Sequence, residues 1–179
     1  GAYYPLAGMS EKVRAQLVAD HFLFKQGDRF LESAGANRDW PSGRGIFHSK
    51  SKQFLTWVNE EDQLRIISME QGGNIYAVFD RLARAVNAIE KRLPFASHPR
   101  FGYLSSCPTN LGTAMRASVH IRIPLLSKHK SFKSVCAKLG LSIRGIHGEH
   151  SESEGGVYDI SNKRRLGVSE VDAINVLCK

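Results

Sequence analysis

The sequence has 179 residues, with 25 Lys and Arg against 17 Asp and Glu, and its formal net charge at pH 7 is +8. This length suits one domain with a sizeable core, and a composition of 42% hydrophobic and 23% charged residues excludes disordered, collagen-like and coiled-coil proteins. The excess of positive charge favours an anionic partner, either a nucleic acid or a small, highly charged ligand such as a nucleoside triphosphate.

The first part of the chain carries patterns for two helices and three short strands. A helix is predicted over residues 10–24 with Ser10 as its N-cap, and a second over residues 28–34, ending at Gly35. Short polar connections separate three apolar runs, at residues 45–47, 54–58 and 64–69. Because connections this short join antiparallel strands, the runs predict an antiparallel meander.

Two longer amphipathic patterns follow. Apolar residues spaced by threes and fours predict a helix from Asn74 to about Leu93, one face of which packs on the sheet. Residues 115–123 alternate strictly, and the polar positions are Arg116, Ser118, His120 and Arg122. This alternation predicts a strand whose apolar face is buried and whose polar face is either solvated or lines a polar ligand site.

The last part of the chain predicts a helix over residues 132–139, strands at 141–143 and 157–160, and a final helix from Ser169 to the end. Asp172 lies three residues after Ser169, as in a weak capping box. A polar loop with four glycines, residues 144–156, lies between the two strands and is of the kind that closes over ligands. Because the final helix has no C-cap, we expect the chain to be part of a larger domain.

Three arginines are candidates for binding phosphate. Neither a P-loop nor a G-x-G-x-x-G motif occurs in the sequence, so side chains must neutralise any bound nucleotide. Arg65, Arg116 and Arg144 lie at the edges of predicted strands or loops. Guanidinium groups match phosphate oxygens geometrically and stay charged, although surface ion pairs are the common alternative for any one of them.

Two glutamates and one cysteine are candidates for holding a cationic substrate. Glu61 precedes Arg65 in a tight turn, and Glu149 follows Arg144 in the glycine-rich loop. Cys107 follows two serines which, with Arg116, could lower its pKa. The alternatives are solvated charged faces for the glutamates and a buried structural thiol for the cysteine. With three widely spaced cysteines, neither a disulfide framework nor a metal cluster is expected.

Two histidines could contact a nucleotide base. His21 lies on the first predicted helix, and His120 on the polar face of the alternating strand. Either imidazole could stack on or hydrogen-bond to a base, and either could be structural. The residues alone thus predict a basic domain of mixed helices and strands with several possible anion contacts.

Several stretches of the sequence resemble the signature motifs of the phosphagen (ATP:guanidino) kinases, and those of arginine kinase most. They are Trp57–Met69, Cys107–Thr113, Met115–His120, Gly148–His150 and Tyr158–Gly167, and the resemblance covers essentially the whole chain. Members of that family move the γ-phosphoryl group of MgATP reversibly to the guanidino nitrogen of arginine, creatine, taurocyamine or a related compound. The resemblance implies an α+β fold, an antiparallel sheet flanked by helices like the glutamine-synthetase-like catalytic domain of that family.

The resemblance also implies a role for each candidate residue. The phosphates of ATP or ADP, with Mg²⁺ bound through them rather than by protein ligands, would be held by Arg65, Arg116 and Arg144. The adenosine would lie at His21, Ser118, Val119, His120 and Asp159. The carboxylates holding the guanidinium would be Glu61 and Glu149, and Cys107 would be the reactive cysteine beside it; Glu61 is our choice for any general base.

The sequence differs from the family pattern in the glycine-rich loop and in the extent of the chain. Ile146 and His147 replace a Thr and an Arg of the family's loop, which removes one positive charge near the phosphates. Residues 1–179 are expected to be a partial C-terminal catalytic domain, without the small helical N-terminal domain, the first catalytic strand and the end of the last helix. Such a fragment is expected to be inactive or nearly so alone, and the surface that truncation exposes would allow it to self-associate.

Other functions remain as alternatives. A taurocyamine kinase or another guanidino kinase is the alternative within the family, and a basic nucleic-acid-binding module is the alternative of another class. The polar face from Arg116 to Arg122 has no aromatic residue of the kind that RNA-binding sheets use, so no nucleic-acid partner is expected. No apolar run approaches the ~18 residues of a membrane span, so a cytoplasmic protein without a membrane partner is expected.

Overall fold

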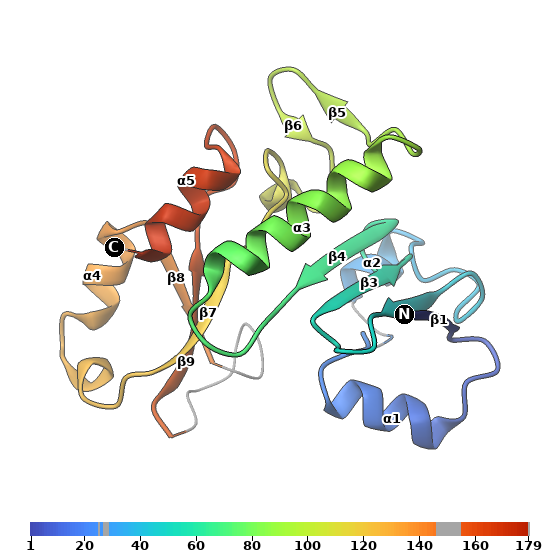
Figure 1. The fold of residues 1–179 in the computed structure, drawn as a ribbon, viewed down its shortest axis with the longest axis horizontal. Helices are drawn as coiled ribbons and strands as arrows, with labels where there is room; N and C mark the ends of the chain where they lie inside the picture. The colour runs from blue at the N-terminus through green and yellow to red at the C-terminus, as the bar shows by residue number, and fades with distance from the viewer. Residues whose placement is uncertain (25, 27–28, 146–154, 179) are drawn as a thin grey trace. The chain divides into compact units, whose positions relative to one another are not determined.

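The computed structural model describes residues 1–24, 26, 29–145 and 155–178, and its chain forms two compact units (Figure 1). Unit 1 is Gly1–Phe95 and unit 2 is Ala96–Lys179. Every strand pairing in either unit is antiparallel among the described residues. This agrees with the α+β class expected from the sequence.

Unit 1 is built on a four-stranded sheet with the order β1-β2-β3-β4. Its strands are β1 (Ala2–Pro5), β2 (Gly45–His48), β3 (Phe54–Val58) and β4 (Leu64–Ser68). The predicted meander is therefore confirmed. Strand β1 was not predicted, because four residues ending in Pro5 carry no readable alternation; it is recognisable only by its pairing with β2.

The core of unit 1 joins this sheet to the segment that follows the first helix. Leu6, Leu23, Phe24 and Ile46 are buried, and Trp40 and Trp57 pack against them. The indole N–H of Trp57 donates a hydrogen bond to the carbonyl oxygen of Phe22 at 2.9 Å. This bond satisfies the polar atom of a large core side chain and fixes the 21–24 segment to β3.

The first helix, α1 (Glu11–Ala19), is shorter than predicted. Ser10 caps it as expected, because its side chain accepts a hydrogen bond from the N–H of Val13. At the other end the N–H of Phe22 bonds to Leu17 O and that of His21 to Val18 O, the paired bonds of a Schellman motif. His21 takes the left-handed conformation, φ 60°, that glycine usually takes there. The prediction that His21 lies on the helix is therefore wrong.

Two more helices complete unit 1. Helix α2 (Arg29–Ser33) ends before Gly35 as predicted, and Gly35 has a φ of +72°. Helix α3 (Ile75–Glu90) begins at the predicted cap Asn74, whose side chain accepts a hydrogen bond from Ala77 N–H at 3.1 Å. It ends three residues before the predicted Leu93. Among the described residues, no helix has the length and apolar character that crossing a membrane requires.

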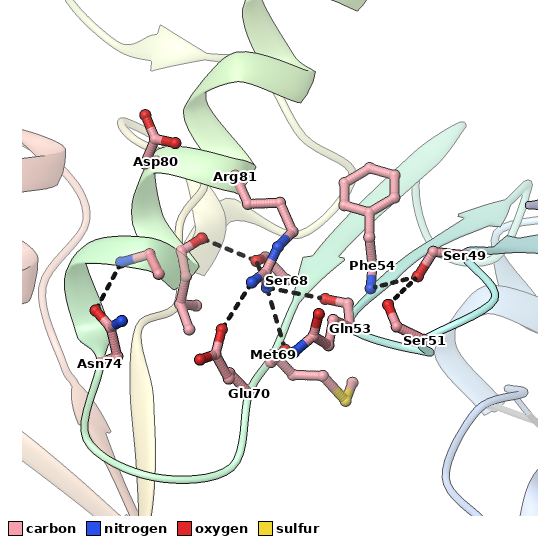
Figure 2. A network of polar contacts seen from close by, with 12 residues as sticks. Ser49, Ser51, Gln53, Phe54, Ser68, Met69, Glu70, Asn74, Asp80 and Arg81 are labelled. Carbon is pink, nitrogen blue, oxygen red and sulfur yellow. Dashed lines mark hydrogen bonds and ion pairs between the residues drawn. The ribbon is translucent and has the colours of Figure 1, made fainter.

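A polar network centred on Arg81 ties α3 to the sheet (Figure 2). The Arg81 guanidinium donates hydrogen bonds to Ser68 Oγ at 3.2 Å, Met69 O at 3.2 Å and Gln53 O at 3.4 Å. It also pairs with Glu70 at 2.7 Å, and Ser68 Oγ donates to Val78 O at 2.8 Å. One half-buried side chain thus connects the helix with the end of β4 and the start of β3.

Unit 2 contains a two-stranded and a three-stranded sheet, the latter with the order β7-β9-β8. Its strands are β5 (Ser97–His98), β6 (Gly102–Tyr103), β7 (Ser118–Arg122), β8 (Leu141–Arg144) and β9 (Val157–Asn162). Its helices are α4 (Phe132–Lys138) and α5 (Glu170–Asn175), with short 3-10 helices η1 (Pro108–Asn110), η2 (Leu126–Lys128) and η3 (Val176–Cys178). The predicted capping box is present at Ser169 and Asp172.

The three-stranded sheet has an apolar face and a polar face. Phe132 and Cys136 of α4 are buried with Ile160 of β9, and Val119, Ile143 and Tyr158 pack against them. Along β7, Val119 is half-buried whereas Ser118 and His120 are exposed, as the alternation predicted. Ile121 departs from the prediction, because 42% of its surface is exposed. The opposite face carries the polar side chains.

We predict that Arg81→Ala lowers the free energy of unfolding by about 1–3 kcal/mol, because it removes a charged donor from four half-buried acceptors. The matched control is Arg84→Ala on the same helix, whose side chain is 74% exposed and pairs with Asp80 one turn away. It should cost ~0.5 kcal/mol or less. Urea unfolding measures both, and equal losses would contradict the role given to Arg81.

Candidate active site

The register of the three-stranded sheet aligns several predicted residues across its polar face. Asp159 in the central strand lies opposite His120 in β7 and opposite Arg144 in β8. One step along, Ser161 lies opposite Ser118 and Ser142. Residues directly opposite in antiparallel strands share a face, so these two rows form one polar surface. Four residues predicted from different parts of the sequence are thereby brought together: Ser118, His120, Arg144 and Asp159.

Asp159 is the buried charge on this surface, and it holds Arg116. Arg116 Nη2 donates to Asp159 Oδ2 at 2.5 Å, and Arg116 Nη1 donates to Ser118 Oγ at 3.5 Å. His120 Nε2 lies 3.8 Å from the same Oδ2 atom. Only 8% of Asp159 is exposed, and its Oδ1 atom is buried without a hydrogen-bond donor from the described chain. A buried carboxylate requires a cationic partner, and here that partner is Arg116. Asp159 thereby holds the Arg116 guanidinium at the polar face.

Val119 and His21, two predicted nucleotide contacts, have different surroundings. Val119 shares its strand with Ser118 and His120, but its side chain packs on the apolar face with Phe132 and Ile160. His21 belongs to unit 1, where it is exposed beyond the end of α1. The sheet register and contacts therefore group Arg116, Ser118, His120, Arg144 and Asp159 within unit 2, whereas the Val119 side chain lies on the apolar face of the same sheet.

In unit 1, Arg65 lies between two carboxylates. Its Nη2 atom is 2.9 Å from Glu60 Oε2 and 3.0 Å from Glu61 Oε2, and its guanidinium carbon lies 5.1 Å from the centroid of the Trp57 ring. The predicted pair of Glu61 and Arg65 is thus in direct contact. The sequence prediction missed Glu60, although the acidic run from Glu60 to Asp62 is a readable signal of concentrated negative charge.

The turn that carries these glutamates is held by Asn59. Its φ is 56°, in the left-handed region that Asn tolerates better than most residues. Its N–H donates to Gln63 O at 3.0 Å, and its side-chain Nδ2 donates to Gly43 O at 2.8 Å. These bonds close the β3–β4 turn and place Glu61 within reach of Arg65.

Cys107 lies at the start of η1 and is half-buried. Its Sγ is 3.0 Å from Thr109 Oγ1. Ser105, one of the serines expected to influence the thiol, donates instead to the backbone oxygen of Cys107 at 2.9 Å. Thr109, two residues downstream, thus brings a hydroxyl into contact with the sulfur. Glu149, Ile146 and His147 lie outside the described residues.

The two other cysteines differ in environment. Cys136 is buried against the sheet, and desolvation by that burial raises the pKa of its thiol. Cys178 is exposed near the end of the chain. These differences make the two residues internal references for any chemistry at Cys107.

The model of the family ATP:guanido phosphotransferase, C-terminal catalytic domain, matches residues 1–179. The chain belongs to this family. The resemblance seen in the sequence motifs is therefore confirmed, and the ion pairs of Arg65 and Arg116 lie within the part of the chain that matches the C-terminal catalytic domain.

Curated relatives agree with this membership. The chain is 62% identical over 177 residues to the arginine kinase of Anthopleura japonica, covering 97% of this chain and 25% of that protein. It is 61% identical over 175 residues to the arginine kinase of Limulus polyphemus, covering 97% of this chain and 49% of that protein. The chain thus spans about half or less of the length of these relatives.

Solved structures of the family have the same fold. The duplicated taurocyamine kinase from Schistosoma mansoni with bound transition-state-analogue components matches with a TM-score of 0.91 at 55% identity, over 99% of this chain and 25% of that one. Lombricine kinase matches with a TM-score of 0.93 at 45% identity, over 98% of this chain and 50% of that one. The antiparallel α+β architecture is therefore that of guanidino kinases.

We predict that the three thiols of this guanidino-kinase chain react with iodoacetamide at pH 8 in an order set by their surroundings. Cys178 and Cys107 should be modified in the native chain, whereas Cys136 should react at least about 10-fold more slowly, because it is buried and its pKa is raised. Peptide mass spectrometry gives the three rates. In urea the difference should disappear; a Cys136 that reacts rapidly in the native chain would contradict the packing of α4.

Proposed function

We propose that the chain acts in the reversible transfer of the γ-phosphoryl group of MgATP to the guanidino group of arginine. The observation that carries this proposal is the partly exposed guanidinium of Arg116, held on the polar face of unit 2 by the buried Asp159. Membership of the ATP:guanido phosphotransferase family gives the reaction class. The arginine kinases at 61% and 62% identity support arginine as the acceptor.

The nucleotide phosphates are assigned to Arg116, Arg65 and Arg144. A guanidinium has five N–H donors, and the contacts with Asp159 and Ser118 use Nη2 and Nη1 of Arg116 once each. Because 31% of the Arg116 side chain is exposed, remaining donors can bind phosphate oxygens while Asp159 keeps the group oriented. His120 and Ser118 are assigned to the adenosine, with His21, Val119 and Asp159 as the further positions that match the family motif.

The guanidino side is assigned to Glu61, Glu149 and Cys107. In the transfer step the guanidino nitrogen attacks the γ-phosphorus, the bond from that phosphorus to the β,γ-bridging oxygen breaks, and ADP leaves with the bond electrons. The guanidinium loses one proton in the process. Glu61 is proposed to orient this group and to accept that proton. Its present ion pair with Arg65 then has to loosen, which phosphate binding by Arg65 would favour.

Electrostatic positioning is the main catalytic contribution in this proposal. Phosphoryl transfer gains most from in-line alignment and from neutralising the charge that spreads over the phosphoryl oxygens. The arginines supply fixed positive charge, and Mg²⁺ enters as part of the nucleotide substrate. Since the chain spans about half the length of the Limulus relative, we also propose that its 179 residues alone bind nucleotide but turn over slowly.

A second acceptor is favoured by specific comparisons. The matched structures include a taurocyamine kinase at 55% identity and a lombricine kinase at 45% identity. Arginine, taurocyamine and lombricine share the guanidino group and differ in the rest of the molecule. The test of the acceptor is the kcat/KM of the wild-type hybrid described below for each of the three compounds, and a larger value for taurocyamine would replace arginine in the proposal.

We predict that Arg116→Ala weakens MgADP binding to the chain by about 10- to 100-fold, the effect of losing a charge-assisted contact of about 1.5–3 kcal/mol. Isothermal titration calorimetry measures the affinity. Arg84→Ala removes the same charge from an exposed helix position and should leave the affinity unchanged. Equal affinities for all three proteins would remove Arg116 from the phosphate site.

We predict that Glu61→Gln lowers kcat by about 10²- to 10⁴-fold with little change in MgADP affinity, the range for loss of a general base. The assay couples ADP formation to NADH oxidation in a hybrid in which residues 1–179 replace the matched part of Limulus arginine kinase. Glu90→Gln, at the exposed end of α3, is the control. Full activity of Glu61→Gln would exclude Glu61 as the base, and activity of the isolated chain equal to that of the hybrid would contradict slow turnover.

A further inference from the structure

Asn162, the last residue of β9, is almost completely buried, and its side chain binds the backbone of three other residues. Only 3% of it is exposed. Its side-chain Oδ1 accepts from the N–H of Ala117 at 2.9 Å, and its Nδ2 donates to Met115 O at 3.3 Å and to Arg164 O at 2.8 Å. Its own N–H donates to Ala117 O at 3.2 Å. Asn162 therefore holds the backbone on both sides of Arg116.

The residues that follow Asn162 hold the segment that leads from Cys107. Thr113 N–H donates to Arg165 O at 3.1 Å, and Arg165 Nη1 donates to Thr109 O at 3.4 Å. Gly112 passes so close that an added Cβ atom would overlap Arg165 O. Its φ of +107° also disfavours any other residue. The 162–165 segment thus contacts the chain near Cys107 and again around Arg116.

We propose that Asn162 is a positioning residue that fixes the Cys107 segment and the Arg116 segment relative to each other. This inference rests on the proposed function, in which Cys107 belongs to the guanidino side and Arg116 to the phosphate side of the reaction. Both segments are anchored on residues 162–165, which are continuous with the central strand of the sheet. Displacement of this anchor therefore shifts both sides at once.

The chemistry of the contact explains why an asparagine is needed. One side chain of this size must offer an acceptor to Ala117 and two amide hydrogens, one to Met115 and one to Arg164. Leucine would leave these buried backbone groups unpaired, and a carboxylate would keep the acceptor but lose both donors. Asn162 binds the backbone of Met115 and Ala117, the two neighbours of Arg116, so it acts on Arg116 through the backbone.

The test is the variant Asn162→Ala. MgADP affinity reports on the Arg116 segment, and the iodoacetamide rate reports on the Cys107 segment. We expect MgADP affinity to fall about 10-fold or more, as for the loss of several buried hydrogen bonds. We also expect the iodoacetamide rate at Cys107 to change about 3-fold or more, while the rate at exposed Cys178 in the same molecule stays constant. Hydrogen exchange should accelerate at the amides of Ala117 and Thr113.

Two controls separate positioning from a general loss of stability. Asn175→Ala removes an exposed asparagine from α5 and should change neither readout. Ile160→Val weakens the core on the other face of β9 and should lower the melting temperature without changing the MgADP affinity or the Cys107 rate. If Asn162→Ala does not fold, Asn162→Gln keeps the amide but displaces it by one methylene, and it should change the same readouts in the same direction.

The inference is overturned if Asn162→Ala leaves the Cys107 rate and the two amides within a factor of two of the wild type. It is also overturned if Ile160→Val alters both readouts as much as the Asn162 variant does. A wild-type chain that does not bind MgADP contradicts the proposed function only. In that case the Cys107 rate and the exchange of Ala117 and Thr113 still decide whether Asn162 fixes the two segments.

Discussion

The ion pair between Asp159 and Arg116 is the interaction on which the polar face of unit 2 depends. A carboxylate that is 8% exposed is costly without a cationic partner, so Arg116 is constrained to stay beside it. Asp159 belongs to the central strand β9, where it lies between His120 and Arg144. The apolar residues on the other side, with α4, give the strand its position. Packing on one face thus sets the electrostatics of the other.

The ion pairs of Arg65 in unit 1 are more exposed to solvent than the pair of Arg116 and Asp159. Arg65 is 43% exposed and is shared by Glu60 and Glu61, and Trp57 lies beneath it. Such a pair is weaker than a buried one, because water screens the charges and competes for the donors. The group at Arg65 is therefore better suited to exchanging partners than the group at Asp159. In the proposed reaction, the former has to release a carboxylate and the latter has only to keep an arginine in place.

The sequence predicted the elements whose signals are local and missed those that depend on distant residues. Ser10, Asn74 and Ser169 were found as caps because their side chains bind backbone three residues away. The alternation of residues around Val119 correctly predicted the polar face of β7. The end of α1 was placed too late, because His21 occupies a position where glycine usually marks the stop. Strands β5 and β6 have two residues each, too few for any pattern.

In the candidate site, too, the sequence identified residues with local signals and missed contacts between distant residues. Residue motifs identified Arg116, His120 and Asp159 as candidates, but the sequence does not show that Arg116 meets Asp159, because register is a property of the folded sheet. Asn162 was not predicted, since a single asparagine at a strand end carries no chemical signal until its three backbone partners are known. Glu60 was overlooked beside its neighbour Glu61.

The strand order β7-β9-β8 also has a consequence for how the site is assembled. Among the described residues, β7 and β8 each pair with β9 and not with each other, although β9 follows both in the chain. Arg116 and Asp159 are 43 residues apart, so their pairing requires the closure of a long loop. In unit 1, by contrast, β2 pairs with its immediate successor β3, and β3 pairs with β4. During synthesis, the arginine that is assigned to the phosphates thus leaves the ribosome well before its carboxylate, and its orientation is among the last features of unit 2 to be set.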